Sequence, residues 1–284
     1  MRLGLVGIDS SHAEDFLRHF NSEARHHDIR VTALWGPNAT SARLAELAAV
    51  APEVAASVSL SDLIAGVDAV IVGDRHGDLH LQHALPCIHA GKPVFVDKPL
   101  ACTLADAEAI LEAAERAGTP FLSGSALRWQ DETQALKMRI AGLREPLSVR
   151  AFGTWYPDSE YGGAIFYAIH TIELMQELIG TSWSHLRLER AGPHPVFKYE
   201  MDDIEAELAF HPLGDTGSSA FGVSLVSPAE TLDRPIPLPD DYMLPVANRI
   251  ARMLQTGDSG MTRDQLLAPV RMMTEIAALL SPRN

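Results

Sequence analysis

The chain has 284 residues, of which 46% are hydrophobic and 21% are charged, enough for two domains of ordinary globular composition or one large one. Its formal net charge of −14 disfavours nucleic acid and anionic membranes as main partners. Two cysteines, Cys87 and Cys102, are too few for a disulfide framework, and no apolar run approaches the roughly 20 residues of a membrane span, so we expect a cytoplasmic protein.

Short apolar runs alternate with amphipathic stretches over residues 1–124. The predicted strands are residues 3–6, 29–35, 67–72, 94–96 and 121–123. The predicted helices are residues 12–20, 39–49, a short one from residue 61, 79–90 and 103–117. This alternation is typical of the α/β class and predicts a doubly wound parallel sheet for the first domain.

The pattern changes after residue 124. Helices are predicted at residues 130–140, 168–178, 245–254 and 263–280. Strands are predicted at residues 148–155, 185–190, 197–210 and 218–225, and the proline-rich residues 234–239 are a predicted loop. We therefore expect residues 125–284 to form a second, α+β domain with an open, mostly antiparallel sheet and helices on one face.

The first predicted strand runs into the turn Gly7-Ile8-Asp9-Ser10-Ser11-His12. A dinucleotide-binding turn reads G-x-G-x-x-G, and only Gly7 fits, because Asp9 and His12 stand in place of the second and third glycines. Ser10 and Ser11 can cap the next helix or donate to a phosphate. The alternative is a capped turn without a ligand.

The second predicted strand ends at Trp35-Gly36 with no acidic residue after it. An acid at this place usually binds the ribose 2′-hydroxyl of NAD. Its absence, with Arg43 a turn or so further on, tilts the expected cofactor weakly from NAD towards NADP. The alternative is that this turn carries no information about the cofactor.

The third predicted strand ends in the richest polar cluster of the chain, at residues 73–83. His80 and His83 are three residues apart on a predicted helix, a spacing that can share a metal ion with Asp74, His76 and Asp78. The preferred interpretation has no metal. In it, His80 faces a cofactor cleft or caps the loop, and His83 lies on the helix surface.

The fourth predicted strand runs into Asp97-Lys98-Pro99. Ligands of parallel sheets bind at the carboxyl ends of the strands, where a lysine can exchange a proton with a hydroxyl or a carbonyl. Asp97 would orient Lys98, and the alternative is a solvated lysine beside a turn. Arg128, which follows the fifth strand, serves either the ligand or a salt bridge.

Two glycines, Gly162 and Gly163, precede the predicted helix that carries His170. Glycines allow a close backbone approach to a ligand, which favours a functional histidine over one buried in the core. The aromatic loop before this helix contributes candidates for a polar small-molecule substrate. The candidate substrate residues are Tyr156, Tyr161 and Glu173.

These segments resemble the Gfo/Idh/MocA family, named for glucose–fructose oxidoreductase and inositol dehydrogenase. The residues that match in order and spacing are Val67–Val72, Leu79-His80, His89–Val94, Asp97–Leu100 and Ala105–Ala107. The E-K-P of the family is D-K-P here. The segment from Gly162-Gly163 to His170 is similar to the one that leads to the active-site histidine of the family, whereas the first turn departs from its glycine pattern.

The resemblance implies an N-terminal Rossmann domain that binds NAD(P) and a C-terminal domain that binds substrate and forms a homodimer or homotetramer through its sheet. It implies hydride transfer between nicotinamide and a secondary alcohol or carbonyl of a sugar or cyclitol, with Lys98 and His170 moving the proton and Asp97 orienting Lys98. The residues expected to border the cofactor are Gly7, Ile8, Asp9, Ser10, Ser11, His12, Trp35, Gly36, Asp74, Arg75, His76, His80, Lys98 and Arg128.

Two other functions remain open at this point. The altered glycine turn is compatible with a redox-inactive binding or regulatory protein on the same scaffold. The polar cluster after the third strand is compatible with a metal-dependent lyase or hydrolase that uses His76, Asp78, His80 and His83.

Overall fold

The computed structural model describes residues 1–23, 25–143, 147–189, 194–212 and 221–281. The chain separates into two compact units, the first formed by Met1–Gly124 with Asp241–Leu266. The second unit holds Ser125–Asp240 and the described residues after Leu266. The expected division at residue 124 places residues 241–266 in the second domain, whereas the structure groups them with the first.

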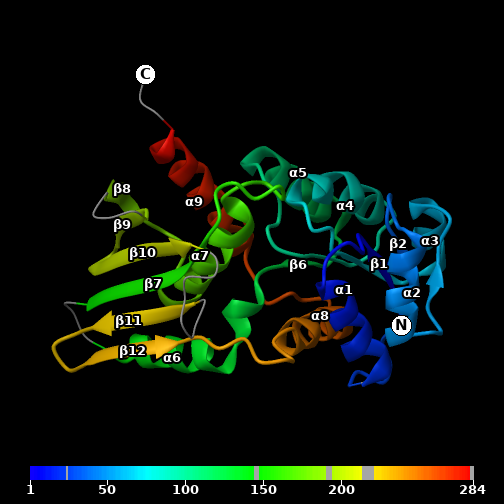
Figure 1. The fold of residues 1–284 in the computed structure, drawn as a ribbon, viewed down its shortest axis with the longest axis horizontal. Helices are drawn as coiled ribbons and strands as arrows, with labels where there is room; N and C mark the ends of the chain where they lie inside the picture. The colour runs from blue at the N-terminus through cyan, green and yellow to red at the C-terminus, as the bar shows by residue number, and fades with distance from the viewer. Residues whose placement is uncertain (24, 144–146, 190–193, 213–220, 282–284) are drawn as a thin grey trace. The chain divides into compact units, whose positions relative to one another are not determined.

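The first unit is built on a six-stranded parallel sheet (Figure 1). Its strands are β1 (Arg2–Val6), β2 (Arg30–Trp35), β3 (Ala55–Ala56), β4 (Ala69–Val72), β5 (Val94–Val96) and β6 (Phe121–Ser123). Their order is β3-β2-β1-β4-β5-β6, which confirms the predicted doubly wound sheet. Since the strand order reverses between β1 and β4, the turns after these two strands flank the point where such sheets bind ligands.

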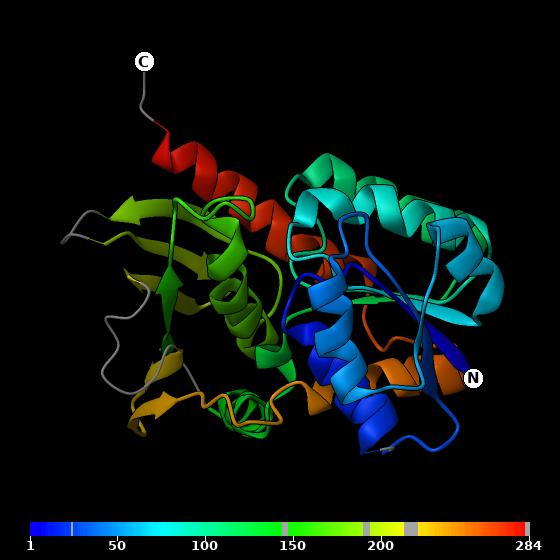
Figure 2. The ribbon, with the colours of Figure 1, turned by 45° about the vertical axis from the view of Figure 1, so that its right-hand side comes forward.

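Helices cover both faces of this sheet. Figures 1 and 2 show α3, α4 and α5 over one face and α1 and α8 over the other. The helices of this unit are α1 (His12–Leu17) with its π-helical continuation η1 (Arg18–Ser22), α2 (Ser41–Val50), α3 (Leu60–Gly66), the 3-10 turn η2 (Gly77–Leu79), α4 (His80–His89), α5 (Leu104–Ala117) and α8 (Leu244–Thr256). Every residue of β4 and β5 is buried, as the continuous apolar runs predict for strands covered on both faces.

Helix α8 is the part of the chain that returns to the first unit. It contacts β6 and η1, and it buries Val246, Ile250 and Met253 at the spacing of one helical face. Its amphipathic pattern predicts a helix with one buried face but not the sheet against which that face packs. This explains why the division drawn from the sequence placed it elsewhere.

The second unit contains a six-stranded mixed sheet in the order β12-β11-β7-β10-β9-β8. Its strands are β7 (Leu147–Trp155), β8 (Ser184–Glu189), β9 (Val196–Met201), β10 (Ile204–Pro212), β11 (Gly222–Val226) and β12 (Thr231–Pro235). Among the described residues, β7 and β10 pair in parallel and the other strand pairs of this sheet are antiparallel, which confirms an open, mostly antiparallel sheet.

Two details of this sheet differ from the predicted strands. The run 197–210 is two antiparallel strands, because the chain reverses at Asp202, which has a positive φ of 51°. The predicted strand 218–225 begins in residues outside the described ranges, and its later part is β11. Strand β12 includes the start of the predicted proline-rich loop, which is tolerated because β12 is an edge strand.

Helices pack on one face of the second sheet. They are the 3-10 turn η3 (Ala126–Trp129), α6 (Asp131–Ala141) and α7 (Ile165–Ile179), while α9 (Arg263–Leu280) spans the boundary between the two residue groups. Helix α7 contacts β7 and β10, and it lies so close to β7 that a Cβ on Gly153 would overlap Thr171 Oγ1. Outward-facing charges pair across the strands on the other face, as Arg150 does with Glu207 at 3.0 Å.

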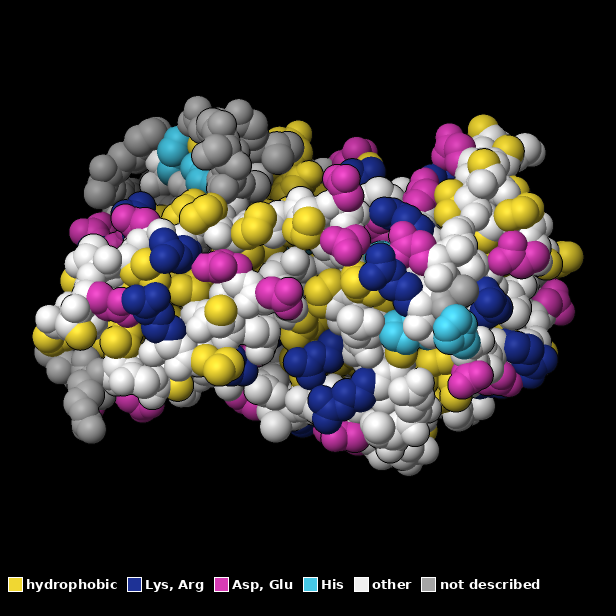
Figure 3. All heavy atoms as spheres, turned by 90° about the horizontal axis from the view of Figure 1, so that it is seen from below, with side chains coloured by type: hydrophobic (Ala, Val, Ile, Leu, Met, Phe, Trp, Pro, Cys, Tyr) yellow, Lys and Arg dark blue, Asp and Glu magenta, His cyan; other side chains and the backbone are white. Residues whose placement is uncertain are grey.

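One face of the protein carries both signs of charge (Figure 3). On the face drawn in Figure 3, Lys and Arg side chains are interspersed with Asp, Glu and hydrophobic ones. Among the described residues, none of the helices combines the length and apolarity needed to cross a bilayer.

Candidate cofactor and catalytic site

The turn after β1 is fixed by Gly7. Gly7 has a φ of 75°, its N–H donates to Trp35 O at 2.9 Å, and a Cβ there would overlap the backbone of Asp74. Only glycine meets both conditions, so the one glycine that matches the dinucleotide pattern is required by the backbone itself.

The remaining turn residues join the turn to the loop after β4. Asp9 accepts the Arg75 N–H at 3.0 Å, and the buried Ser10 hydroxyl donates to Gly73 O at 3.1 Å. Ser11 is the N-terminal cap residue of α1, but its side chain makes no capping hydrogen bond. The carboxylate that replaces the second glycine is therefore paired with a backbone donor.

Arg43, on α2, binds the turn after β1. Its guanidinium donates to Ile8 O at 2.6 Å and to Ser10 O at 2.8 Å, and it binds the carboxylates of Glu14 and Glu46. The hydrogen bond with Glu14 raises the pKa of Arg43 above its ordinary value. The arginine that the sequence offered to a 2′-phosphate is thus already bound to two acids.

A pocket lies among the turns after β1, β2 and β4. Its lining residues are Gly7, Ile8, Asp9, Gly36, Pro37, Asn38, Ala39, Arg43, Asp74 and Leu79. Five of the predicted cofactor residues are therefore brought together around one pocket. Trp35 packs edge-on against the His83 ring instead, with ring centroids 5.2 Å apart.

His12, in place of the third glycine, faces the end of β5. Its Nδ1 lies 2.6 Å from Asp97 Oδ2, and the two side chains are 12% and 5% exposed. Burial alone would raise the pKa of the Asp97 carboxyl, but the neighbouring His12 and Lys98 charges outweigh burial and hold that pKa well below its ordinary value. Asp97 therefore stays ionised beside Lys98.

Lys98 follows Asp97 at the carboxyl end of β5, is 8% exposed, and precedes a cis peptide bond to Pro99. Tyr242, on the segment that returns to the first unit, packs its ring 5.9 Å from that of His12. Burial and the carboxylates of Asp15 and Asp97 raise the pKa of the Tyr242 phenol. Sequence analysis missed Tyr242, since no local pattern links it to residues 12 and 97.

Histidines hold the loop after β4 from inside. His80 is fully buried, with Nε2 2.9 Å from Asp74 O and Nδ1 2.7 Å from Pro99 O. His83 Nδ1 lies 2.8 Å from Asp74 Oδ2, and both side chains are almost completely buried. The expectation that His83 lies on the helix surface is wrong, because its side chain is buried in contact with the Asp74 carboxylate. Since the two rings bind different partners, His80 and His83 do not form a shared metal site.

In the second unit, His170 is half-buried on α7. Its Nδ1 lies 2.6 Å from Ser125 Oγ, which also accepts the Leu127 N–H at 3.2 Å, and its ring packs against Phe221. Ser125 thereby fixes the orientation of the imidazole. The sequence analysis did not identify Ser125, because a serine after a strand does not show that its partner is His170, 45 residues further along the chain.

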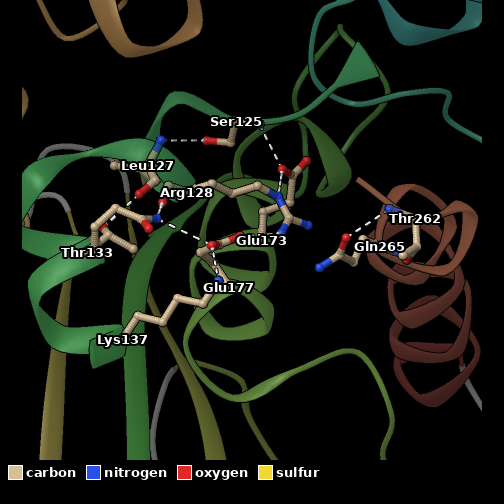
Figure 4. A network of polar contacts seen from close by, with 10 residues as sticks. Ser125, Leu127, Arg128, Thr133, Lys137, Glu173, Glu177, Thr262 and Gln265 are labelled. Atoms are coloured by element: carbon tan, nitrogen blue, oxygen red, sulfur yellow. Dashed lines mark hydrogen bonds and ion pairs between the residues drawn. The ribbon is translucent and has the colours of Figure 1, made fainter. Parts of the chain in front are cut away.

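Arg128 and Glu173 bind each other (Figure 4). Arg128 Nε lies 2.5 Å from Glu173 Oε2, Arg128 Nη1 lies 3.3 Å from Glu177, and Lys137 Nζ binds the other oxygen of Glu177 at 2.6 Å. Glu173 also accepts the Ser125 N–H at 2.7 Å. Arg128 was expected at the cofactor and Glu173 at the substrate. The two residues bind each other instead, in a buried ion pair that links η3 to α7.

Aromatic side chains gather at the start of α7. The Tyr161 ring lies 5.1 Å from Phe166, and Tyr156, which is 42% exposed, lies 6.5 Å from Tyr167. The glycines before the helix, Gly162 and Gly163, both have positive φ. This leaves the two candidate substrate tyrosines at one end of the helix that carries His170.

Residues 1–125 match the Gfo/Idh/MocA family, described as an oxidoreductase family with an NAD-binding Rossmann fold. Inositol 2-dehydrogenase of Acidiphilium cryptum (strain JF-5) is 36% identical over 155 residues, which cover 53% of this chain and 45% of that protein. The chain therefore matches the curated relatives over about half of their length.

Solved structures share the fold over nearly the whole chain. A dehydrogenase from Clostridium difficile has a TM-score of 0.79 at 14% identity, covering 98% of this chain and 99% of that one. The WlbA dehydrogenase from Thermus thermophilus, solved with NAD and UDP-GlcNAcA, has a TM-score of 0.75 at 17% identity, covering 100% and 96%. At these identities the likeness shows the fold.

Proposed function

Because the chain belongs to the Gfo/Idh/MocA oxidoreductase family, with its NAD-binding Rossmann fold, we propose that it is a dehydrogenase of a sugar-like or polyhydroxylated small molecule. It would transfer hydride between NAD(P) and a secondary alcohol or carbonyl. The similarity to inositol 2-dehydrogenases supports this substrate class. The observation that carries the proposal is Lys98, nearly buried at the carboxyl end of β5 beside an ionised Asp97.

The residues at the strand ends fit a dinucleotide. The pocket beside Gly7 and Gly36 lies where doubly wound sheets bind nucleotides, at the switch point of the strand order. The Asp9 carboxylate would repel a pyrophosphate. Its hydrogen bond from the Arg75 N–H offsets part of its negative charge. We therefore assign the turn after β1 and the start of the loop after β4 to the cofactor.

Lys98 is the proposed proton-transfer group. Oxidation of an alcohol removes a hydride from carbon and a proton from oxygen, and a bound nicotinamide would supply the hydride acceptor. In its neutral form Lys98 Nζ would take the hydroxyl proton, and in the reverse reaction its ammonium form would return a proton to the carbonyl oxygen. Asp97, held by His12, orients the lysine from its own strand end.

His170 is the proposed second acid–base residue. Ser125 Oγ, 2.6 Å from Nδ1, holds the imidazole in one orientation, and we assign proton exchange with a substrate to this ring. Tyr156 and Tyr161 are the proposed substrate contacts near the same helix. Assembly as a homodimer or homotetramer through the second sheet stays a prediction.

The contacts of Arg43 bear on the choice between NAD and NADP. A 2′-phosphate at this arginine would meet the carboxylates of Glu14 and Glu46. Two like charges about 4 Å apart repel by about 1 kcal/mol in water, roughly a fivefold change in an equilibrium constant. We therefore propose that the weak preference for NADP drawn from the sequence does not hold and that NAD is used at least as well.

The test is an assay of nicotinamide reduction with a panel of inositol isomers and aldoses, using NAD⁺ and NADP⁺ in parallel. We expect turnover with at least one polyol and a kcat/KM for NAD⁺ no lower than that for NADP⁺. Glu46→Gln should raise the relative kcat/KM for NADP⁺ roughly fivefold, while Glu108→Gln, an exposed acid on α5, should not change it. A strong preference of the native protein for NADP⁺ would refute the assignment of Arg43.

A further inference from the structure

Three side chains with different ligand atoms converge beside the predicted site. His76 and Asp78 lie in the loop after β4, and Cys102 lies just before α5. Their ligand atoms, one from each residue, all lie within 4.8 Å of one another. Among the described residues, this is the set of three or more such groups close enough to hold one ion. It shares His76 and Asp78 with the metal set considered from sequence but replaces both helical histidines with a thiol.

The loop that carries His76 and Asp78 is packed directly on the segment that carries Cys102. A Cβ on Gly77 would lie 2.9 Å from Pro99 Cγ, closer than real Cβ contacts, and 3.0 Å from Cys102 Sγ, closer than most of them. Glycine between the two ligands therefore permits the approach of the thiol.

The same two segments are tied together by His80. One ring nitrogen of His80 contacts Asp74 O, in the first segment, and the other contacts Pro99 O, in the second. Because this ring is fully buried, the two segments are held in place before any ligand binds. His76 is oriented as well, since its Nδ1 accepts the Asp78 N–H at 3.2 Å.

We propose that His76, Asp78 and Cys102 bind a single zinc ion or another thiophilic divalent cation, with a further coordination position open to solvent or a ligand. An imidazole, a carboxylate and a thiolate are each common zinc ligands, and the mixed set suits a borderline-soft ion better than magnesium or calcium. Three protein ligands leave one corner of a tetrahedron free, as in zinc sites that exchange a ligand. His76 and Cys102 are half-buried and Asp78 is exposed, so an ion has a route in from solvent.

Cobalt(II) is the probe, because a cobalt–thiolate bond gives a charge-transfer absorption band that aqueous cobalt lacks. Untagged protein is treated with a chelator, desalted and titrated with CoCl₂, and then with ZnCl₂ in competition. We expect one cobalt per chain, the thiolate band at saturation, and its loss on addition of zinc.

Variants assign the ligands. Cys102→Ser should abolish the band, and Asp78→Asn should weaken cobalt affinity by about 10-fold or more, since even the loss of an outer partner of a metal ligand costs 10- to 100-fold. Cys87→Ala removes the other thiol and His89→Gln removes an exposed histidine of α4, and both should keep the band. Far-ultraviolet circular dichroism checks the fold of each variant.

The proposal is overturned if folded native protein shows no thiolate band at stoichiometric cobalt, or if the band survives in Cys102→Ser. If Cys102→Ser does not fold, Asp78→Asn decides, because Asp78 is an exposed loop residue, and unchanged affinity in that variant contradicts the site. None of these measurements uses dehydrogenase turnover, so they test the metal site independently of the proposed function.

Discussion

Replacing Lys98 by methionine should lower kcat for polyol oxidation by about 10²- to 10⁴-fold, the range that a lost acid–base group costs. Methionine is apolar and flexible enough to fill the space of the lysine stem, which is 8% exposed, so the fold should be kept. The dinucleotide should still bind within a few-fold, because its proposed contacts lie mainly on the turns after β1, β2 and β4. Steady-state kinetics and titration with NADH separate the two quantities.

Lys92→Met is the matched control for this prediction. Lys92 is a partly buried lysine of the same unit whose Nζ donates to Val67 O at 2.7 Å, before β5 rather than after it. Its replacement should leave kcat within about threefold of the native value. If Lys98→Met retained native turnover, or if both lysine variants lost activity equally, Lys98 would not be the proton-transfer group.

Arg128→Met should lower the free energy of unfolding by about 3–5 kcal/mol, the usual cost of leaving a buried charge without its partner. In the variant, the Glu173 carboxylate, which is 3% exposed, loses the guanidinium that binds it, whereas Glu177 keeps its ion pair with Lys137. The double variant Arg128→Met/Glu173→Leu should recover most of this loss, because apolar residues of similar volume replace buried ion pairs with little penalty. Urea unfolding followed by tryptophan fluorescence gives the comparison, since Trp129 adjoins the pair.

An exposed ion pair of the same unit calibrates the measurement. Arg139 binds Glu230 with its side chain 47% exposed, so Arg139→Met should cost no more than about 1 kcal/mol. Equal losses in the Arg128 and Arg139 variants would mean that the Arg128 network does not hold η3 on α7. That outcome would also remove the proposed support for Ser125 and, through it, for His170.

The parallel sheet could be predicted because burial on both faces leaves a direct trace in the sequence. Each residue of β4 and β5 must be apolar, and glycines and capping hydroxyls mark the helix ends between the strands. The two-residue β3 was missed, since two alanines carry no strand pattern. The hairpin between β9 and β10 was read as one strand, because it turns on two aspartates rather than on glycine or proline.

The candidate site could be predicted only in part, for a physical reason. Residue types at strand ends pointed to Gly7, Asp74 and Lys98, because the topology of a doubly wound sheet places those ends together. Pairings between side chains are not visible in this way. The bond of His12 to Asp97 joins residues 85 positions apart, and Arg128 could not be assigned to Glu173 rather than to a ligand until the geometry was known.

The account rests on one claim, that a nicotinamide dinucleotide binds beside the turn after β1 despite Asp9 and His12. Titration of the protein with NADH by isothermal calorimetry tests it, with Ala39→Trp to fill the pocket and Ala65→Trp, at an exposed alanine on α3, as the control. The account predicts saturable one-to-one binding to the native protein and to Ala65→Trp, and at least a tenfold loss of affinity in Ala39→Trp. Absence of binding of both NADH and NADPH to well-folded native protein would contradict it and favour a redox-inactive binding protein on the same scaffold.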